Sequence, residues 1–259
     1  LLRVDFNVPL KGSELLDDER LIRALPTIKH IAQNAKSLKI ISHLGRPEET
    51  GLVQDKFSLK PVAKKLAELL GQEVNLVNSL KELKSLENIS MLENIRFYKG
   101  EKQNEDNLSQ ALAETADVFV MDAFGTAHRK QASTYGVTKF VKEACVGLLV
   151  EEELMALKKI IDSPEKPLLG IIGGSKISTK MKILKSLTNH VDQLIIGGAL
   201  ANTCFKALGK NIGKSLYEEA YLDLAKTIIE DKKILLPSYV VVTKGRDSKS
   251  QEKHIDEVE

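Results

Sequence analysis

Short β-branched runs alternate with amphipathic helical patterns along the first half of the chain. The run "LKIISH" at 38–43 is typical of a buried strand, and 58–71 has the apolar spacing of a helix. An apolar stripe predicts another helix from about Asp18 to Gln33, with a kink at Pro26. Further strands are predicted in "EVNLVN", "NISMLEN" and "DVFVMDAF", with the helix "EDNLSQALAETA" between the last two. This βαβα order predicts a mostly parallel sheet covered on both faces.

The pattern changes near residue 147. A long charged helical stretch, "LLVEEELMALKKIIDSPEKP", ends in a proline-rich break, and "LLGIIGG" then begins a second βαβ series. We predict one domain at 1–146, a connecting hinge helix at 147–164 and a second α/β domain at 165–259. The second domain shows about three strands, where a doubly wound domain usually has five or six. The second domain is therefore expected to be incomplete.

Composition narrows the class of protein. A chain of 259 residues with 42% apolar residues can form one large domain or two ordinary ones. A net charge of +2 gives no indication of nucleic acid or an anionic membrane as partner. The apolar runs are too short to span a bilayer and no signal peptide is visible, so a cytoplasmic protein is expected. Cys145 and Cys204 lie in apolar settings, which favours two buried free thiols over one disulfide.

Candidate chemistry begins with "RVDFNVP", which places Arg3, Asp5 and Asn7 on alternate positions and so on one face near a strand end. A solvated edge strand would explain this run equally well. Ligands of open α/β sheets, however, bind outside the carboxyl ends of the strands. The cationic residues that follow the predicted strands, or begin the first helix, are Arg20, His43, Arg46, Arg96, His128 and Arg129.

Each of these residues has a plainer explanation when taken alone. Arg20 would serve as a solvated helix residue, His43 as an ordinary loop histidine, and Arg96 as the surface partner of Glu93. Together they place a cation after nearly every strand. Arginine offers a planar fork of donors that suits phosphate and carboxylate, so the set predicts a site for a small polyanion.

Two strand ends in the second domain lead into glycine pairs and helices. They are Gly173 and Gly174 in "IIGGSKISTK", and Gly197 and Gly198 in "IIGGALANT". Glycine pairs at a helix start expose backbone N–H groups to an anion, and Lys176 and Lys180 would share a helix face. The spacing is not that of a Walker A loop. Close helix–strand packing and a phosphate-binding face both remain open interpretations.

Six segments, "LLRVDFNVP", "SHLGRP", "LENIRF", "DAFGTAHR", "GGSKISTK" and "KALG…IGKSLYEE", stand in the order found in phosphoglycerate kinases. The chain resembles that family over essentially its whole length. The resemblance implies an α/β fold of two Rossmann-like parallel-sheet domains joined by a hinge helix, with the second domain incomplete here.

The activity that the resemblance implies is a step of glycolysis. A phosphoryl group moves reversibly from 1,3-bisphosphoglycerate to ADP, giving 3-phosphoglycerate and ATP, by direct in-line transfer with hinge closure. Mg²⁺ enters bound to ADP or ATP, and no metal ligand is expected from this chain. The family also suggests a monomer, with no nucleic-acid or membrane partner.

Residue roles follow from the same resemblance. The substrate-binding residues would be Asp5, Asn7, Arg20, His43, Arg46, Arg96 and Arg129. Arg20, Lys176 and Lys180 would stabilise the group in transfer. The nucleotide site would include Gly174, Lys176, Lys180, Gly197 and Gly198.

The chain also departs from the family pattern. Thr179 stands where Asp is common, and Ala199 replaces a glycine of the nucleotide wall; we expect both to be tolerated, with Ala199 able to narrow the adenosine pocket. The later motifs "WNGPxGVFE" and "GGGD(S/T)" are absent, so the chain is expected to be about two thirds of a phosphoglycerate kinase. The alternative is a fragment that binds 3-phosphoglycerate without catalysis. An Asp-nucleophile phosphatase built on "DFN" is disfavoured, because Asn7 occupies the place of its second carboxylate.

Overall fold

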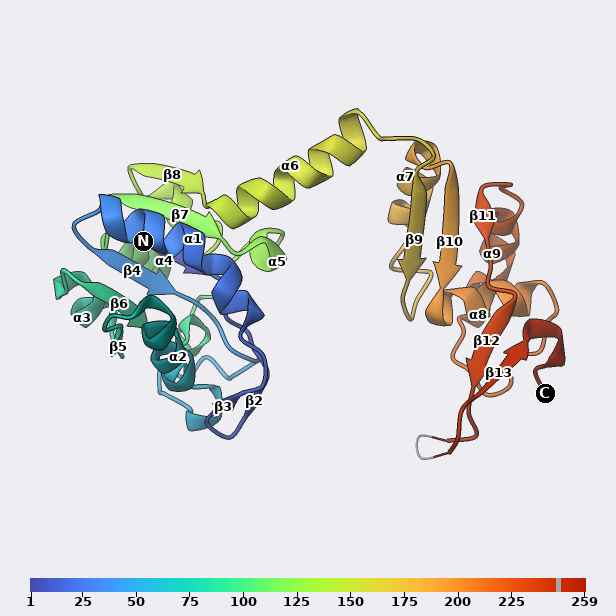
Figure 1. Cartoon of the computed structure of the whole chain (residues 1–259), viewed down its shortest axis with the longest axis horizontal. Helices are drawn as coiled ribbons and strands as arrows, with labels where there is room; N and C mark the ends of the chain where they lie inside the picture. The colour runs from blue at the N-terminus through green and yellow to red at the C-terminus, as the bar shows by residue number, and fades with distance from the viewer. Residues whose placement is uncertain (246–247) are drawn as a thin grey trace. The chain divides into compact units, whose positions relative to one another are not determined.

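Figure 1 shows the chain as a computed structural model, which describes residues 1–245 and 248–259. The chain divides into two compact units, Leu1–Leu157 and Lys158–Glu259. Each unit contains its own parallel sheet with helices. The α/β class expected from the sequence is therefore confirmed.

The first unit is built on a six-stranded sheet of order β5-β6-β4-β1-β7-β8, and every neighbouring pair is parallel. Four of its strands coincide with predicted strands outside the opening run, and β8 was not predicted. The strands are β1 Leu2–Val4, β4 Leu38–Ile41, β5 Asn75–Val77, β6 Ile89–Leu92, β7 Val118–Asp122 and β8 Glu143–Val146. A small antiparallel hairpin pairs β2, Leu10–Lys11, with β3, Glu14–Leu15.

Helices cover both faces of this sheet (Figure 1). The helices are α1 Glu19–Asn34, α2 Lys60–Leu70, α3 Leu80–Ser85, α4 Asp106–Ala113 and α5 Phe124–Ala127, with short 3₁₀ turns η1 Asp55–Phe57, η2 Ile95–Phe97 and η3 Gly136–Lys139. One buried cluster packs α1 and α2 on residues of β1 and β4, through Leu21, Ile28, Leu66, Leu2 and Ile40. A second packs α3 and α4 through Leu83, Leu112, Ile41 and Phe119. Helix α1 continues through Pro26 as one helix.

Helix α6, Leu148–Asp162, occupies the stretch predicted as a connecting helix at 147–164. Its first turn is fastened within the first unit, because the backbone N–H of Leu148 donates to Thr27 Oγ1 at 3.0 Å and that of Val150 to Asp122 Oδ1 at 3.1 Å. The predicted domain boundaries, and a hinge role for this helix, stay predictions.

The second unit contains a three-stranded parallel sheet of order β11-β10-β9 and an antiparallel hairpin. Its elements are β9 Leu169–Gly173, α7 Met181–His190, β10 Gln193–Gly197, α8 Gly198–Ala207, η4 Glu219–Tyr221, α9 Leu222–Ile229, β11 Ile234–Leu235, β12 Tyr239–Val242, β13 Gln251–His254 and η5 Ile255–Glu257. Ile172, Leu194 and Ile196 are buried, whereas Leu169, Ile171 and Leu235 on the opposite face are exposed. Within the described residues, one face of this sheet is therefore left exposed.

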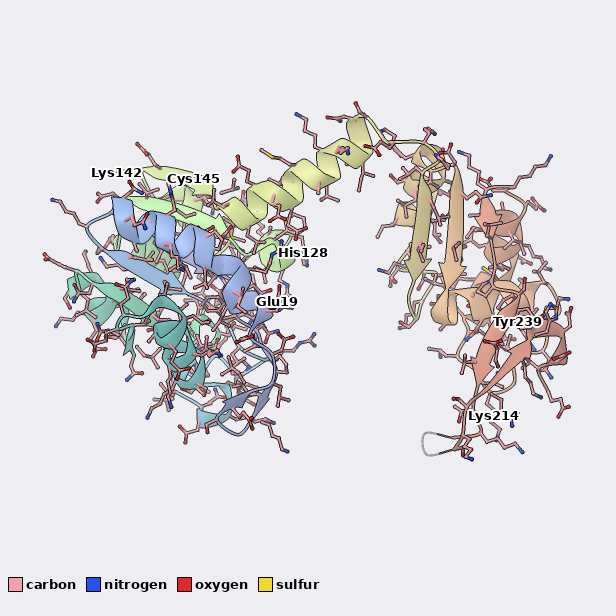
Figure 2. All side chains as sticks on the ribbon, viewed as in Figure 1. Glu19, His128, Lys142, Cys145, Lys214 and Tyr239 are labelled. Atoms are coloured by element: carbon pink, nitrogen blue, oxygen red, sulfur yellow. The ribbon has the colours of Figure 1, made fainter. Side chains whose placement is uncertain are left out.

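The two cysteines differ in environment, and the prediction of two buried thiols is wrong for one of them. Both are free, but Cys145 is exposed (Figure 2). It lies on β8, an edge strand whose four residues are all exposed. Cys204 is fully buried in α8, and burial raises the pKa of its thiol to about 11. Among the described residues, no helix has the length and apolar character needed to cross a membrane.

Candidate functional site

The carboxyl edge of the first sheet collects the polar residues predicted to bind an anion. Asp5 and Asn7 follow β1, and His43 and Arg46 follow β4. Arg96 lies in η2 after β6, Arg129 follows α5, and Arg20 lies in the first turn of α1. We call Arg20, Arg46, Arg96 and Arg129 the cationic cluster.

Asp5 orients one member of this cluster. Its Oδ2 lies 2.5 Å from Arg20 Nη1, with Asp5 17% exposed and Arg20 51% exposed. An ion pair with this exposure contributes little to stability. Its role is geometric, because it aims a helix side chain across the edge of the sheet.

Asn7 fixes the loop that carries His43 and Arg46. Its Oδ1 accepts the backbone N–H of Gly45 at 2.8 Å, and Arg96 Nη1 donates to the carbonyl of Gly45 at 2.5 Å. The amide of Asn94 binds the same loop, with Nδ2 2.7 Å from the carbonyl oxygen of Leu44. At a strand end, Asp5 and Asn7 could either bind a hydroxyl of the ligand or orient the neighbouring arginines. In the structure Asp5 pairs with an arginine, and Asn7 holds the loop.

Gly45 itself is required by this loop. Its φ is +61°, and a Cβ there would lie 2.5 Å from the ring of Phe57. Both the left-handed backbone and the close ring exclude larger residues. The loop between His43 and Arg46 is thus tightly constrained.

The guanidinium groups lie close enough to act on one another. The pKa of Arg96 is lowered first by burial and then by Arg129, with a smaller contribution from Arg46. Arg96 is 5% exposed and its Nε has no hydrogen-bond partner in the described chain. A buried donor beside like charges favours the binding of an anion.

Arg46, Arg96 and Arg129 have no carboxylate partner within residues 1–245 and 248–259. The proposed surface pair of Arg96 with Glu93 does not form. Glu93 instead accepts the hydroxyl of Ser58 at 2.6 Å and the backbone N–H of Leu59 at 2.6 Å, at the start of α2. The edge of the sheet therefore keeps an excess of positive charge.

His43 lies beside this cluster and is neutral. It is 2% exposed, and its pKa is lowered to about 2 by burial and then by Arg3, Arg96, Arg129 and Arg20. The alternative of an ordinary loop histidine, with its hydrogen bond satisfied inside the fold, stays open, because Nδ1 lies 3.2 Å from Arg3 Nη2.

Three buried polar residues behind the edge were not singled out as functional. Arg3, Glu101 and Ser133 are each 0% exposed. Arg3 was grouped with Asp5 and Asn7 as a strand-end residue, but it lies inside β1 and reaches no solvent. The only signal for it was a charged residue within an apolar strand. No local sequence signal indicated Glu101 or Ser133, because their hydrogen-bond partners are distant in sequence.

His128 and Asp122 take no direct part in the cluster. His128 is exposed (Figure 2), and no hydrogen bond or ion pair of its side chain is found in the described chain. Asp122 is buried and accepts the backbone N–H of Val150, at the start of α6. Its Oδ1 therefore helps to order the start of α6.

The glycine pairs of the second unit meet at the ends of neighbouring strands. Gly173 of β9 is in register with Gly197 of β10. Gly198 has a φ of +62°, and a Cβ there would lie 3.4 Å from the backbone of Gly174. The carbonyl of Gly174 accepts the N–H of Leu200 at 3.0 Å. Close packing and an exposed helix start therefore occur together at this edge.

The two lysines do not share a helix face, and that prediction is wrong. Helix α7 begins at Met181, so Lys176 lies in the preceding loop and Lys180 is the residue before the helix. Ser178 ties this loop to Glu218, because its N–H and hydroxyl both donate to the Glu218 carboxylate, at 3.0 and 2.6 Å. Lys180 still lies near the glycines, since a Cβ on Gly174 would be 3.5 Å from Lys180 Cε.

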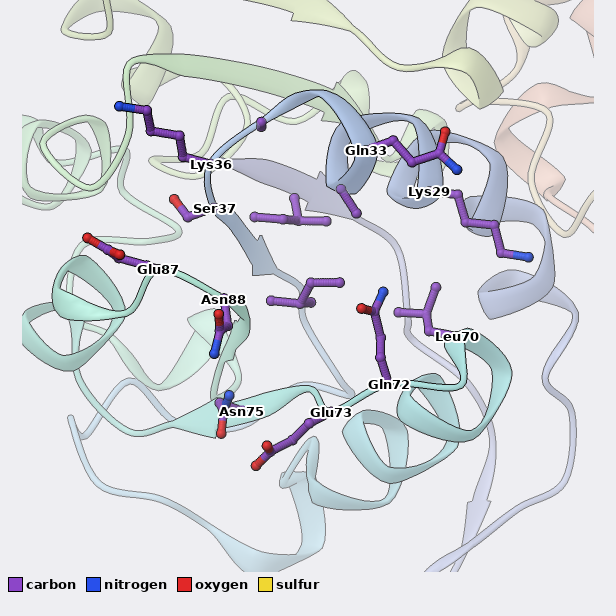
Figure 3. Close-up of a pocket in the computed structure, with 14 residues that line it drawn as sticks. Lys29, Gln33, Lys36, Ser37, Leu70, Gln72, Glu73, Asn75, Glu87 and Asn88 are labelled. Atoms are coloured by element: carbon purple, nitrogen blue, oxygen red, sulfur yellow. The ribbon is translucent and has the colours of Figure 1, made fainter.

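A separate cavity of about 560 Å³ lies at the opposite edge of the first sheet (Figure 3). Its lining includes Leu38, Asn75 and Ile89, the first residues of β4, β5 and β6, with Lys36 and Gln33 beside them. Parallel sheets bind ligands at their carboxyl ends. This cavity at the amino ends is therefore not the candidate site.

Fold and site together define an α/β protein whose first unit presents a cationic edge at the strand ends and whose second presents glycine-rich strand ends. A family model described as phosphoglycerate kinase matches residues 1–259. The chain therefore belongs to the phosphoglycerate kinase family.

Individual relatives agree. The phosphoglycerate kinase of Coxiella burnetii (strain RSA 493 / Nine Mile phase I) is 45% identical over 267 residues, and that of Vibrio campbellii (strain ATCC BAA-1116) is 46% identical over 264 residues. Each match covers 100% of this chain and 68% of the relative. The solved Coxiella burnetii structure has a TM-score of 0.83, covering 100% of this chain and 68% of that one. The Pyrococcus horikoshii OT3 structure, 26% identical, has a TM-score of 0.81 and covers 98% and 67%.

Proposed function

We propose that the cationic cluster of this chain binds 3-phosphoglycerate or 1,3-bisphosphoglycerate, and that the glycine-rich edge of the second unit binds ADP or ATP carrying Mg²⁺. The reaction is the reversible transfer of a phosphoryl group from 1,3-bisphosphoglycerate to ADP. Membership of the family supports the reaction, and the unneutralised guanidinium groups support the substrate.

The observation that carries the proposal is the set of three guanidinium groups, on Arg46, Arg96 and Arg129, without carboxylate partners in the described chain. 3-Phosphoglycerate bears a phosphate at one end and a carboxylate at the other. Arginine forks bind both groups with two parallel hydrogen bonds. We assign Arg46, Arg96, Arg129 and His43 to the phosphate, and Asp5 and Asn7 to the hydroxyl and carboxyl end.

Arg20 has a different role in the proposal. Its guanidinium is aimed by Asp5 and half-exposed, so it is available to a group that moves. Phosphoryl transfer needs alignment and neutralisation of charge more than covalent chemistry. Arg20 would stabilise charge on the phosphoryl group in transit, and Lys176 and Lys180 would do so from the nucleotide side.

Several finer features stay predictions: hinge closure, the monomeric state and placement in the cytoplasm. Hinge closure would exclude water that otherwise hydrolyses the acyl phosphate.

The test is a calorimetric titration of the 259-residue chain with 3-phosphoglycerate, with two variants beside it. Arg129→Ala removes one unpaired guanidinium, and we expect the dissociation constant to rise roughly ten- to hundredfold. Lys36→Ala removes the same charge at the opposite edge of the sheet and should leave binding unchanged. Equal binding by wild type and Arg129→Ala would contradict the assignment.

A second measurement separates an enzyme from a binding fragment. ATP formation by the same 259-residue chain, from 1,3-bisphosphoglycerate and Mg-ADP, would support the full reaction. Binding of 3-phosphoglycerate without ATP formation would support the fragment, a candidate favoured by the 68% coverage of the relatives.

A further inference from the structure

We propose that Arg3 is a positioning residue that holds His43 as a neutral imidazole with its proton on Nε2, so that His43 gives the bound anion a hydrogen bond without adding charge. The inference rests on the proposed function, because the anion is the phosphate of the phosphoglycerate. Its geometry, however, lies within the first unit and is independent of any ligand.

Arg3 is held by three contacts inside the fold. Its Nη1 donates to the carbonyl of Val4 at 2.5 Å, its Nε to Ser133 Oγ at 3.0 Å, and its Nη2 lies 3.2 Å from His43 Nδ1. The side chain is 0% exposed, so it cannot reach a ligand in solvent. Among the three contacts, the one to His43 joins Arg3 to a predicted ligand-binding residue, whereas the charge of Arg3 also acts at longer range on Asp5, Arg96 and Arg129.

The contact with Arg3 decides the tautomer of His43. A guanidinium has only donors, so His43 Nδ1 must be the acceptor and cannot carry a proton. Asp5 Oδ1 would favour a proton on Nδ1, but it lies 3.8 Å away, beyond hydrogen-bond distance. The closer group determines the outcome, and the proton of the neutral ring is on Nε2.

Neutrality follows from the surroundings. Burial is the main cause that lowers the pKa of His43, because it opposes a charged imidazole. Four guanidinium groups lower the pKa further: those of Arg3 in β1, Arg96 in η2, Arg129, and Arg20 in α1. The carboxylate of Asp5 also faces the ring, with Oδ1 3.8 Å from Nδ1. A neutral donor suits this position, because the guanidinium groups already supply the positive charge that a phosphate needs.

A second pair of residues fixes Arg3. The hydroxyl of Ser133 accepts from Arg3 Nε and donates to Glu101 Oε1 at 2.6 Å. The backbone N–H of Ser133 donates to Glu101 Oε2 at 2.9 Å. Ser133 therefore links a buried carboxylate to a buried guanidinium, and the chain of contacts ends at His43 Nδ1.

The Nε2 proton proposed for His43 is available to a ligand. In the described part of the chain, Nε2 of His43 has no hydrogen-bond partner. An N–H left without a partner beside several guanidinium groups is placed to donate to an anion held by them.

The test uses NMR of ¹⁵N-labelled histidine in the 259-residue chain without ligand. The His43 signals are assigned by their loss in His43→Gln. We expect the wild type to show a neutral ring with the proton on Nε2 from pH 8 to pH 5. A proton on Nδ1, or an imidazolium at pH 7, would overturn the proposal. Apart from the His43→Gln spectrum used for assignment, this measurement is made on the wild-type chain and needs no substrate to bind.

Two substitutions then ask whether Arg3 is the cause. Arg3→Met keeps the length without a donor, and we expect a mixture of tautomers and titration of His43 within the pH range tested. Arg3→Lys keeps a donor and should restore the Nε2 proton. An unchanged tautomer in Arg3→Met would overturn the positioning role. Ser133→Ala is a milder variant, because it keeps both Arg3 and Glu101 and removes only the hydroxyl that links them. We expect a small fraction of His43 to carry its proton on Nδ1 in this variant.

Ligand binding completes the test. Titration with 3-phosphoglycerate should show a dissociation constant roughly tenfold higher for Arg3→Met than for Arg3→Lys, as expected for one lost hydrogen bond to a charged group. Equal affinities of these two variants would contradict a role for the tautomer in binding. If wild type shows the Nε2 proton but no binding, the proposed function fails while the assignment of the tautomer stands.

Discussion

The candidate sites at the carboxyl edges of the two parallel sheets consist of different chemical groups. In the first unit the candidate site consists of side chains, several of them buried, and a network of hydrogen bonds fixes their loop. In the second unit the candidate site consists of glycine backbone, with an exposed Lys176 and a half-buried Lys180 beside it.

The sheets that support these edges also differ, in the number of their strands and in how far their faces are covered. The first has six strands with buried clusters on both faces. The second has three parallel strands in the described residues of a chain that spans 68% of its relatives' length, and Leu169, Ile171 and Leu235 are exposed on one face. Rigid packing on both sides suits a site whose specificity comes from placed side chains. A backbone site depends instead on local turn geometry.

The largest effect is expected at Arg20. If this residue acts on the phosphoryl group in transit, Arg20→Ala should lower kcat on the order of 100-fold. The dissociation constant of 3-phosphoglycerate should change much less, because the interaction grows only as charge develops. Steady-state kinetics and calorimetry on the same variant give both numbers.

Arg23→Ala is the matched control for Arg20. Arg23 lies one turn further along α1 and pairs with Glu152 and Glu153 of α6 at 3.2 and 3.9 Å. Arg23→Ala should change neither kcat nor the dissociation constant of 3-phosphoglycerate. Equal losses of turnover and affinity in Arg20→Ala would indicate a plain binding role.

A pair of glycine substitutions sharpens the contrast between the edges. Gly45 and Gly198 have φ values of +61° and +62°, so alanine is strained at both. Gly45→Ala also meets the Phe57 ring at 2.5 Å, whereas Gly198→Ala meets backbone at 3.4 Å. We expect about 2–4 kcal/mol of destabilisation at Gly45 and about 1–2 at Gly198. Amide hydrogen exchange reports each unit separately, and equal effects would contradict the tighter packing of the first edge.

The stability of the first unit should depend on pH through His43, which lies in that unit. Its folded pKa of about 2 lies below the ordinary value of 6.5, so the unfolded chain takes up a proton as pH falls below 6.5 and the folded chain does not. The free energy of unfolding should then fall by roughly 1.4 kcal/mol per pH unit, or about 2–3 between pH 6.5 and 4.5.

His43→Gln isolates that contribution, since its amide oxygen can still accept from Arg3. Burial shifts the pKa of the Leu1 amine and that of Glu101 as well, but both groups are common to wild type and variant. Urea unfolding at the two pH values should show a shallower pH dependence for His43→Gln. Parallel curves would mean that His43 titrates normally in the folded protein.

The smallest effect is expected at Ala199, in the first turn of α8. Ala199→Gly should change the dissociation constant of ADP less than threefold and cost up to about 1 kcal/mol of stability. A large gain in ADP affinity would show instead that Ala199 narrows the adenosine pocket.

Much of the fold and part of the site could be predicted from local patterns. The alternation of strand and helix placed β4, β6 and β7 correctly, and the rule that ligands bind at carboxyl ends gathered Arg96 and Arg129 onto one edge. Strand β8 was missed because its residues are exposed and lack the apolar run of a buried strand. Lys176 was misplaced on a helix because Ser178 pairs with Glu218, 40 positions away.

The sequence by itself determined the order of the elements, the parallel sheets and the cations at strand ends, because periodicity and residue chemistry are local properties. The tertiary structure alone decided that Arg3 is buried, that Cys145 is exposed and that the pKa of the buried His43 is lowered to about 2. Burial, desolvation and hydrogen-bond partners depend on residues far apart in the chain. Ser133, 130 positions from Arg3, is the clearest example, since nothing near either residue indicates that they touch.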